Sequence, residues 1–250
     1  MLICNASHAQ GFLKKLLKDT PNKEEIVLDT IPISLDKDMT FYPCKIVDGK
    51  IIASGNLGIK KDQEETAFIN AILYVIDKAE RGKEHIVQMD YDKRSFSVVI
   101  EAASEFYPEN STYYKYANTF YLTEENISFL STELHVCYKN LMGDIKENAF
   151  ENLNPQKKAK HKNYINELAA INSIYMNGLA DFIRTNQPES IYHWDEIKTG
   201  TIVKGMNMTE CLLSIGKPMH ERKNGNQTKW MVNNDFVVIF EDGKVINVIR

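Results

Sequence analysis

The segment 195–250 carries the feature that most constrains the fold of this chain, a dense set of turn residues between short apolar runs. We expect a short helix to begin between Asn207 and Thr209 and to end at Gly216. Glycine adopts the left-handed conformation that closes a helix, and Pro218 prevents its continuation. The residues that punctuate the segment are Gly205, Gly216, Pro218, Gly225 and Gly243.

Two further turns predict strands after this helix. Asn224–Gly225 is a favoured type I′ pair, and it predicts a hairpin between the runs on its two sides. Asp242–Gly243 lies between two more apolar runs. The segment 195–250 is therefore expected to form a short helix followed by a three-stranded antiparallel sheet.

Residues 1–105 indicate an α+β unit with antiparallel hairpins. Asp48–Gly49 lies between two apolar runs and suits a tight turn that needs positive φ. The run 62–82 begins with acidic residues, carries a broad apolar face and ends in Arg81–Gly82, which predicts a helix. A strand, a turn over residues 90–93 and a second strand are expected to follow.

Residues 106–190 are expected to contain a tyrosine-rich connection and then an antiparallel helical hairpin. Apolar residues recur at helical spacing in two stretches that Asn154–Pro155 separates. Two long helices joined by so short a break favour an antiparallel pair. The fold class expected is thus α+β, with domains over 1–105, 106–190 and 195–250. In the first helical stretch the recurring residues are Ile127, Leu130, Leu134, Cys137, Leu141 and Ile145.

Composition excludes several classes of protein. The chain has 250 residues, of which 43% are hydrophobic and 26% charged, and its formal net charge is −4. Such a chain can build a packed core. It shows no basic domain or stripe of the kind that nucleic-acid binders carry, and no apolar run approaches the ~20 residues of a membrane span. We therefore expect no nucleic-acid partner and no integral membrane segment.

The cysteines and the first residues bear on localisation. Met1 to Asn5 are too few and too weakly apolar to form a signal peptide, so the sequence as it stands predicts a cytoplasmic protein. The alternative is a periplasmic or outer-membrane lipoprotein whose signal is missing upstream, with Cys4 as the lipidated residue. The cysteines are widely separated and are expected to be isolated buried thiols. They are Cys4, Cys44, Cys137 and Cys211.

The sequence contains no motif of a phosphate-binding, hydrolytic or metal-binding site. The six histidines stand in none of the recognised metal spacings, and the neighbouring aspartates lack the rest of a calcium loop. No cofactor and no metal ion are expected. The alternative is an enzyme whose site lies in the N-terminal unit, because the histidine partner of a nucleophilic cysteine can come from anywhere in a fold. Its candidate residues are Cys44, His85, Asp90 and Asp92.

Several groups of residues near the C-terminus recur at the spacing of a known family. They are Gly205–Met206, Thr209–Glu210, Ile215–Gly216–Lys217–Pro218, Trp230 and Phe240–Glu241–Asp242–Gly243–Lys244–Val245. This pattern resembles the small α+β domain of the SmpA/BamE-like outer-membrane lipoproteins and of β-lactamase inhibitory protein. Asn207 stands where threonine or serine is usual, and Met231 stands where an aromatic residue often follows the tryptophan.

The resemblance implies a scaffold or inhibitory domain without catalytic activity, usually periplasmic through a lipidated cysteine. It also implies that Trp230 packs the helix against the sheet and that the remaining motif residues fix turns. Those turn residues are Gly205, Gly216, Pro218 and Gly243.

We therefore expect a non-enzymatic bacterial protein-interaction or scaffold protein, envelope-associated or inhibitory, with a protein as its partner. The expected contact surfaces are the face of the C-terminal sheet and the tyrosine-rich segment. Tyrosine gives a large amphipathic contact area at low entropic cost. The residues assigned to these surfaces are Trp230, Tyr113, Tyr114 and Tyr116.

Overall fold

A computed structural model of the chain describes residues 38–48, 50–60, 63–78, 84–108, 111–123, 125–140, 142–153 and 158–250. Cys4 therefore lies outside the described residues. The chain divides into two compact units, each built from two segments of sequence. Unit 1 comprises Met1–Gly58 and Ile86–Gly178, and unit 2 comprises Ile59–His85 and Leu179–Arg250.

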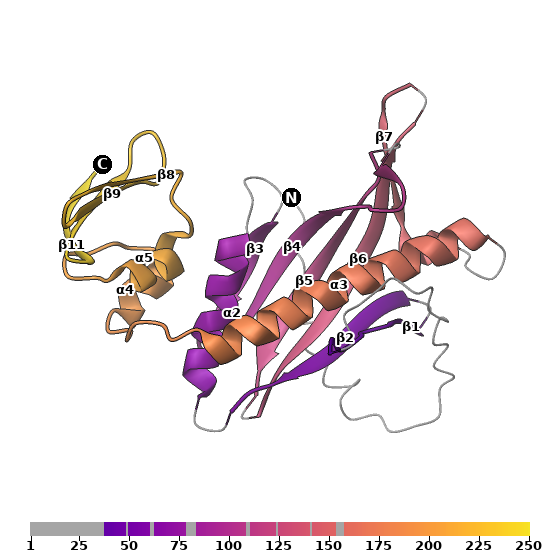
Figure 1. Cartoon of the computed structure of the whole chain (residues 1–250), viewed down its shortest axis with the longest axis horizontal. Helices are drawn as coiled ribbons and strands as arrows, with labels where there is room; N and C mark the ends of the chain where they lie inside the picture. The colour runs from indigo at the N-terminus through magenta and orange to yellow at the C-terminus, as the bar shows by residue number, and fades with distance from the viewer. Residues whose placement is uncertain are drawn as a thin grey trace. The chain divides into compact units, whose positions relative to one another are not determined.

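Unit 1 is built on a seven-stranded sheet with the order β1-β2-β6-β5-β4-β3, and β7 pairs with β6 beside β2 (Figure 1). The strands are β1 (Cys44–Val47), β2 (Lys50–Gly58), β3 (Glu84–Asp90), β4 (Ser95–Ala103), β5 (Tyr113–Leu122), β6 (Asn126–Lys139) and β7 (Ile145–Ala149). A short 3₁₀ helix, η2 (Phe150–Asn152), follows β7.

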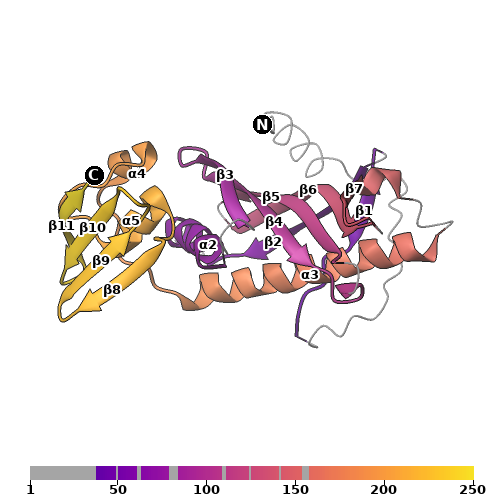
Figure 2. The same ribbon diagram turned by 90° about the horizontal axis from the view of Figure 1, so that it is seen from above.

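The helix α3 (Ala159–Thr185) lies along one face of this sheet, and polar bonds as well as apolar contacts hold it there (Figures 1 and 2). Asn118 of β5 and Ser131 of β6 form a buried triangle with Asn172 of α3, with bonds of 2.6–3.2 Å. Buried amides and hydroxyls are tolerated because each of them has a partner. The apolar core around this triangle includes Phe96, Ile100, Phe120, Phe129, Val136 and Leu168.

The helical hairpin predicted over residues 106–190 is wrong, because its first half is sheet. The tyrosine-rich segment is β5, and the stretch that repeats at helical spacing is β6 and β7. A predicted boundary after residue 105 would also cut a single sheet, since β4 pairs with β5 from Ala103↔Tyr113 onward. Only the second predicted helix is present, as α3.

The elements predicted for the first part of the chain are confirmed where the structure describes them. Val47 pairs with Lys50, so a tight hairpin turn begins at Asp48, which has a φ of 50°; Gly49 lies outside the described residues. The predicted helix is α2 (Glu64–Lys78), with acidic residues in its first turn. Residues 91–94 form the turn between β3 and β4.

Unit 2 contains α2, the end of α3, α4 (Trp194–Thr199), α5 (Met208–Ile215) and a four-stranded antiparallel sheet. The sheet has the order β11-β10-β9-β8, so the three strands predicted for this segment are corrected to four. The strands are β8 (His220–Asn224), β9 (Gln227–Met231), β10 (Val237–Glu241) and β11 (Lys244–Ile249).

The first hairpin of this sheet turns one residue later than predicted. Asn224 pairs with Gln227, so the loop residues are Gly225 and Asn226. Gly225 has a φ of 61° and Asn226 has no positive φ, which is the pattern of a type II′ turn instead of type I′. The second hairpin follows the prediction, since Asp242 and Gly243 both have positive φ, at 47° and 76°.

Candidate functional site

The C-terminal sheet has one covered face and one open face. Alternate residues of its strands point inward and are at most 7% exposed, and α5 lies on this side (Figure 2). These inward residues are Thr228, Trp230, Val238, Phe240 and Val245. Among the described residues of unit 2, no helix or strand lies over the other side (Figures 1 and 2), which we call the open face.

Trp230 belongs to the covered face. Its side chain is 3% exposed, and its ring packs edge-on against Phe240 at 4.7 Å between centroids. Its indole N–H donates to the Glu221 carboxylate at 3.0 Å, so the polar group of the ring is also satisfied within the unit. A tryptophan so buried stabilises the module and offers no contact area to a partner. Its assignment to the contact surface is therefore corrected.

The strand register arranges the open face in rows of side chains. One row contains Met231, Val237 and Ile249, with His220 at its end, and we call it the apolar row. The next row runs Arg222, Lys229, Ile239 and Asn247, and we call it the cationic row. A third row runs Asn224, Gln227, Glu241 and Lys244.

The charges on the open face are mostly positive. Arg222, Lys229 and Lys244 are exposed, and they share the face with one carboxylate, Glu241, which accepts a hydrogen bond from Gln227 at 3.1 Å. The ion pairs formed by the described residues involve none of the three cations. A chain with a net charge of −4 thus presents a locally cationic surface here.

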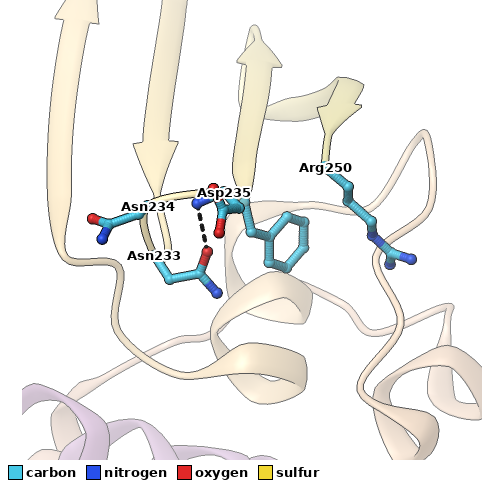
Figure 3. A pocket seen from close by; sticks show the side chains of 5 residues that line it. Asn233, Asn234, Asp235 and Arg250 are labelled. Atoms are coloured by element: carbon cyan, nitrogen blue, oxygen red, sulfur yellow. Dashed lines mark hydrogen bonds between the residues drawn. The ribbon is translucent and has the colours of Figure 1, made fainter.

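A shallow hollow of about 450 Å³ lies at one end of this sheet (Figure 3). The β9–β10 connection supplies Asn233, Asn234, Asp235 and Phe236, and Arg250 completes the lining. The Asn233 side chain accepts a bond from the Asp235 N–H at 2.9 Å, and the Arg250 guanidinium lies 5.4 Å from the Phe236 ring centre. The hollow adjoins the apolar row, because Met231 and Val237 flank this connection.

Sequence reasoning missed the buried carboxylate that anchors the helix under the sheet. Glu210 is fully buried and forms a capping box with Asn207, whose side chain accepts from the Glu210 N–H at 2.7 Å. The carboxylate accepts from the N–H groups of Tyr192, His193 and Asn207 at 2.6, 3.0 and 2.7 Å, and lies 3.0 Å from the His193 ring nitrogen. The spacing Asn207-x-x-Glu210 is the signal that could have revealed it.

These donors decide the ionisation of Glu210. Burial alone would raise its pKa, but the hydrogen bonds from Tyr192, Asn207 and His193 outweigh that effect and hold the pKa below its usual value. The carboxylate is therefore ionised at neutral pH. All of its partners belong to unit 2, and the group ties the segment before α4 to the start of α5.

The predicted turn glycines all have positive φ, but Gly216, with a ψ of −164°, is not in the left-handed helical conformation predicted for the end of its helix. Gly205, Gly216 and Gly243 have φ values of 91°, 76° and 76°, which L-residues with a side chain rarely adopt. Gly216 ends α5, and its N–H donates to the Leu212 carbonyl at 2.8 Å. Pro218 follows two residues later, between α5 and β8.

The tyrosine-rich segment does not provide the contact surface expected of it. Tyr114 and Tyr116 are 0% and 1% exposed, so both are removed from the predicted surface. Tyr113 is half-buried, and burial together with a hydrogen bond to Cys137 raises its pKa to about 12. In a strand of a sheet covered by α3, alternate side chains necessarily enter the core.

Tyr114 leads to a second buried carboxylate, Glu167 of α3, which is 1% exposed. Glu167 accepts from the Tyr114 hydroxyl at 2.5 Å, from the Ser104 hydroxyl at 2.8 and 2.9 Å, and from the N–H groups of Glu105 and Phe106 at 2.6 and 2.9 Å. The group therefore joins α3 to β5 and to the residues that follow β4. Its hydrogen-bonding capacity is used within unit 1.

The described residues of the predicted enzyme site do not form a single cluster. Cys44 is 2% exposed, its thiol lies 3.8 Å from the Ile165 carbonyl, and burial raises its pKa to about 12. A buried thiol of this kind is not a nucleophile, so the version of the alternative built on Cys44 fails. His85 lies in β3, but its side chain is outside the described part of the structure.

Asp90 and Asp92 lie at the β3–β4 turn and serve it locally. The Asp90 carboxylate accepts from the Lys93 N–H and ammonium at 2.9 and 2.8 Å, and these bonds lower its pKa. Asp92 is exposed.

Within the described residues, no three or more histidine, cysteine, aspartate or glutamate side chains are grouped as a metal ion would need. No helix of the described residues is long and apolar enough to cross a bilayer.

Comparisons with known proteins assign no family to this chain. No family model and no curated protein matches it. The crystal structure of a TBP-like protein from Parabacteroides distasonis aligns with 56% of this chain and 97% of its own, at 13% identity and a TM-score of 0.48. That of a DUF4468 family protein from Bacteroides ovatus aligns with 58% and 92%, at 14% identity and a TM-score of 0.40.

Proposed function

We propose that this chain is a non-enzymatic protein-interaction protein and that it binds its partner through the open face of the C-terminal sheet. One observation carries the proposal. Arg222 and Lys229 stand directly opposite each other on β8 and β9, both exposed and neither in an ion pair among the described residues. Like charges opposite each other destabilise a sheet, and natural proteins accept such local costs mainly at functional sites.

The chemistry beside these two cations supports a protein partner. The apolar row provides Met231, Val237 and Ile249, the last of them 46% exposed, next to the cationic row. Protein interfaces combine an apolar centre with a polar rim, and their centres are poor in lysine. On the open face the apolar row lies at one end of the sheet with the cationic row next to it, so Arg222 and Lys229 border the apolar contact and can meet acidic groups of the partner.

Reversal of these charges tests the proposal. The full chain and its R222E/K229E variant are used to capture partners from the native host, and each captured protein is then produced pure and titrated against both. We expect the purified partner to bind the wild-type chain and to lose at least about tenfold in affinity for the variant, because complementary charges become repulsive.

A matched control changes the same charge elsewhere. Lys139 and Lys146 are exposed lysines at neighbouring positions of β6 and β7 in unit 1, and K139E/K146E alters the net charge by the same amount. The proposal predicts that this control binds as the wild type does. Equal affinity of the R222E/K229E variant and the wild type for every purified partner would overturn it.

A further inference from the structure

The C-terminal sheet has a free edge at β8 that a partner can contact. β8 is the edge strand of the sheet, and among the described residues it pairs with β9 alone. All five side chains of β8 are exposed. We infer that the partner contributes an extended, acidic segment that adds to β8 as a further strand. This inference rests on the proposed function, since it names what meets the cations of the open face.

The register shows which backbone groups of β8 are available. Asn224 and Gln227 flank a two-residue turn, so they exchange both of their backbone hydrogen bonds. The pattern alternates along the strand, and the N–H and C=O groups of Glu221 and Lys223 therefore point away from β9. Within the described residues, neither residue makes a backbone hydrogen bond to another element.

The opposite edge of the sheet differs in this respect. At β11, Val245 exchanges backbone bonds of 2.9 Å with Gly205 and Met206, and Asn207 forms a bridge with Lys244. The segment before α5 thus covers the start of that edge. Extension of the sheet by a strand is consequently favoured at β8.

Charge selects the kind of strand that can join. Strand addition would place an incoming side chain beside Arg222 on the open face, on the side away from Lys229. A carboxylate there relieves the repulsion between the two cations. On the open face, a second copy of β8 would instead bring another Arg222, and charged edge strands are a common means of preventing such self-pairing.

A synthetic strand tests the inference directly with the full chain. The probe is a fluorescent peptide that alternates glutamate and valine, and its matched controls alternate lysine and valine or carry N-methyl groups on alternate backbone amides. We expect binding of the glutamate peptide alone, an affinity that falls as salt is added, and a loss of at least about tenfold in the Arg222→Glu variant. Exchange of the Glu221 and Lys223 amide protons should slow on binding.

A backbone variant separates strand addition from simple charge attraction. Lys223→Pro removes an N–H that points outward, so the ladder to β9 keeps its hydrogen bonds, and Lys223→Ala controls for the lost ammonium. We expect peptide binding to survive in the alanine variant and to vanish in the proline variant. Because the proline could unfold the strand, the amide protection in the wild-type chain serves as the second measurement.

The outcomes distinguish this inference from the proposed function. Strand addition would be overturned if the glutamate peptide did not bind, or if the lysine peptide bound equally well. It would also be overturned if a folded Lys223→Pro variant kept its affinity for the peptide, or if the wild-type chain associated with itself through β8. If purified partners still depend on Arg222 and Lys229 in that case, the proposed function stands. If the R222E/K229E variant binds them as well as the wild type, both fall.

Discussion

The Glu167 carboxylate gives the sharpest prediction for the stability of unit 1. One of its oxygens accepts from the N–H groups of Glu105 and Phe106 and from Ser104, and the other accepts from Tyr114 and Ser104. Glu167→Gln keeps one acceptor oxygen and replaces the other by an NH₂ group. The backbone donors and the Ser104 hydroxyl can stay bonded to the remaining oxygen, whereas the Tyr114 hydroxyl must turn round to accept from the new NH₂ group.

The cost follows from the charge that is lost. A hydrogen bond to a charged group contributes about 1.5–3 kcal/mol, and a neutral one about 0.5–1.5 kcal/mol. Loss of charge assistance over several bonds, partly offset by the lower cost of burying an amide, predicts a destabilisation of roughly 2–4 kcal/mol. Tyr114→Phe removes only one of the donors and should cost about 1.5–3 kcal/mol.

Urea unfolding followed by circular dichroism measures these changes as differences in the free energy of unfolding. Glu125→Gln, at an exposed position between β5 and β6, is the matched control and should lie within about 0.5 kcal/mol of the wild type. A Glu167→Gln variant as stable as that control would show that the carboxylate does not hold α3 to the sheet.

Three further predictions concern other parts of the chain. Because the pKa of Glu210 is lowered in the folded protein, its ionised form stabilises the fold above the unfolded pKa of about 4.3, and this stability is lost as the pH falls through the folded pKa. The free energy of unfolding of Glu210→Gln should therefore fall less on acidification than that of the wild type, and an identical pH profile would refute this. A Cβ at Gly55 would lie 2.5 Å from the Tyr42 ring, so Gly55→Ala should cost about 1–3 kcal/mol in urea unfolding, whereas Gly58→Ala meets no atom within 4 Å and should cost clearly less. The described cysteines, Cys44, Cys137 and Cys211, are buried, so a soluble thiol reagent at neutral pH should label none of them until urea is added. Peptide mass spectrometry measures this labelling, and rapid labelling of the native protein would contradict their burial.

Local turn chemistry was the part of the fold that the sequence predicted best. Asp48 and Asp242–Gly243 lie in the hairpins expected of them, because positive φ at such positions depends on the residues themselves. The helix α2 was likewise visible in its acidic first turn and broad apolar face. The shift of one residue at Gly225 shows the limit of this reasoning, since the flanking register selects between two turn types.

The long strand β6 was mistaken for a helix for an identifiable reason. A bulge opposite Tyr116 inserts an extra residue near Glu133, which has a φ of 53°. The buried alternation of Ile127 and Phe129 therefore changes phase and continues at Leu134 and Val136. Leu130 and Cys137 are buried on the opposite face of the strand. Buried residues from both faces, combined with the phase change, recur at intervals of three and four residues, which imitates a helix.

The candidate site could be predicted only in part. The sequence placed Trp230 in the C-terminal module, but which side of the strand faces α5 depends on the strand register. The same register sets Arg222 opposite Lys229, a pair separated along the chain by the β8–β9 turn. The bonds of Glu167 to Ser104 and Tyr114, and those of Glu210 to Tyr192 and His193, join separate segments of the sequence, and local patterns reveal only the capping box of Glu210.

Photo-crosslinking in the native host tests the central claim most directly. A photoreactive amino acid is placed at Lys229 or Ile239 on the open face, or at Lys139 or Lys146 in unit 1, and the adducts are identified by mass spectrometry. We predict one reproducible protein adduct from both open-face positions, absent from the unit 1 positions and lost when Arg222 is changed to glutamate. No adduct from the open face, or the same adducts from both units, would contradict the account.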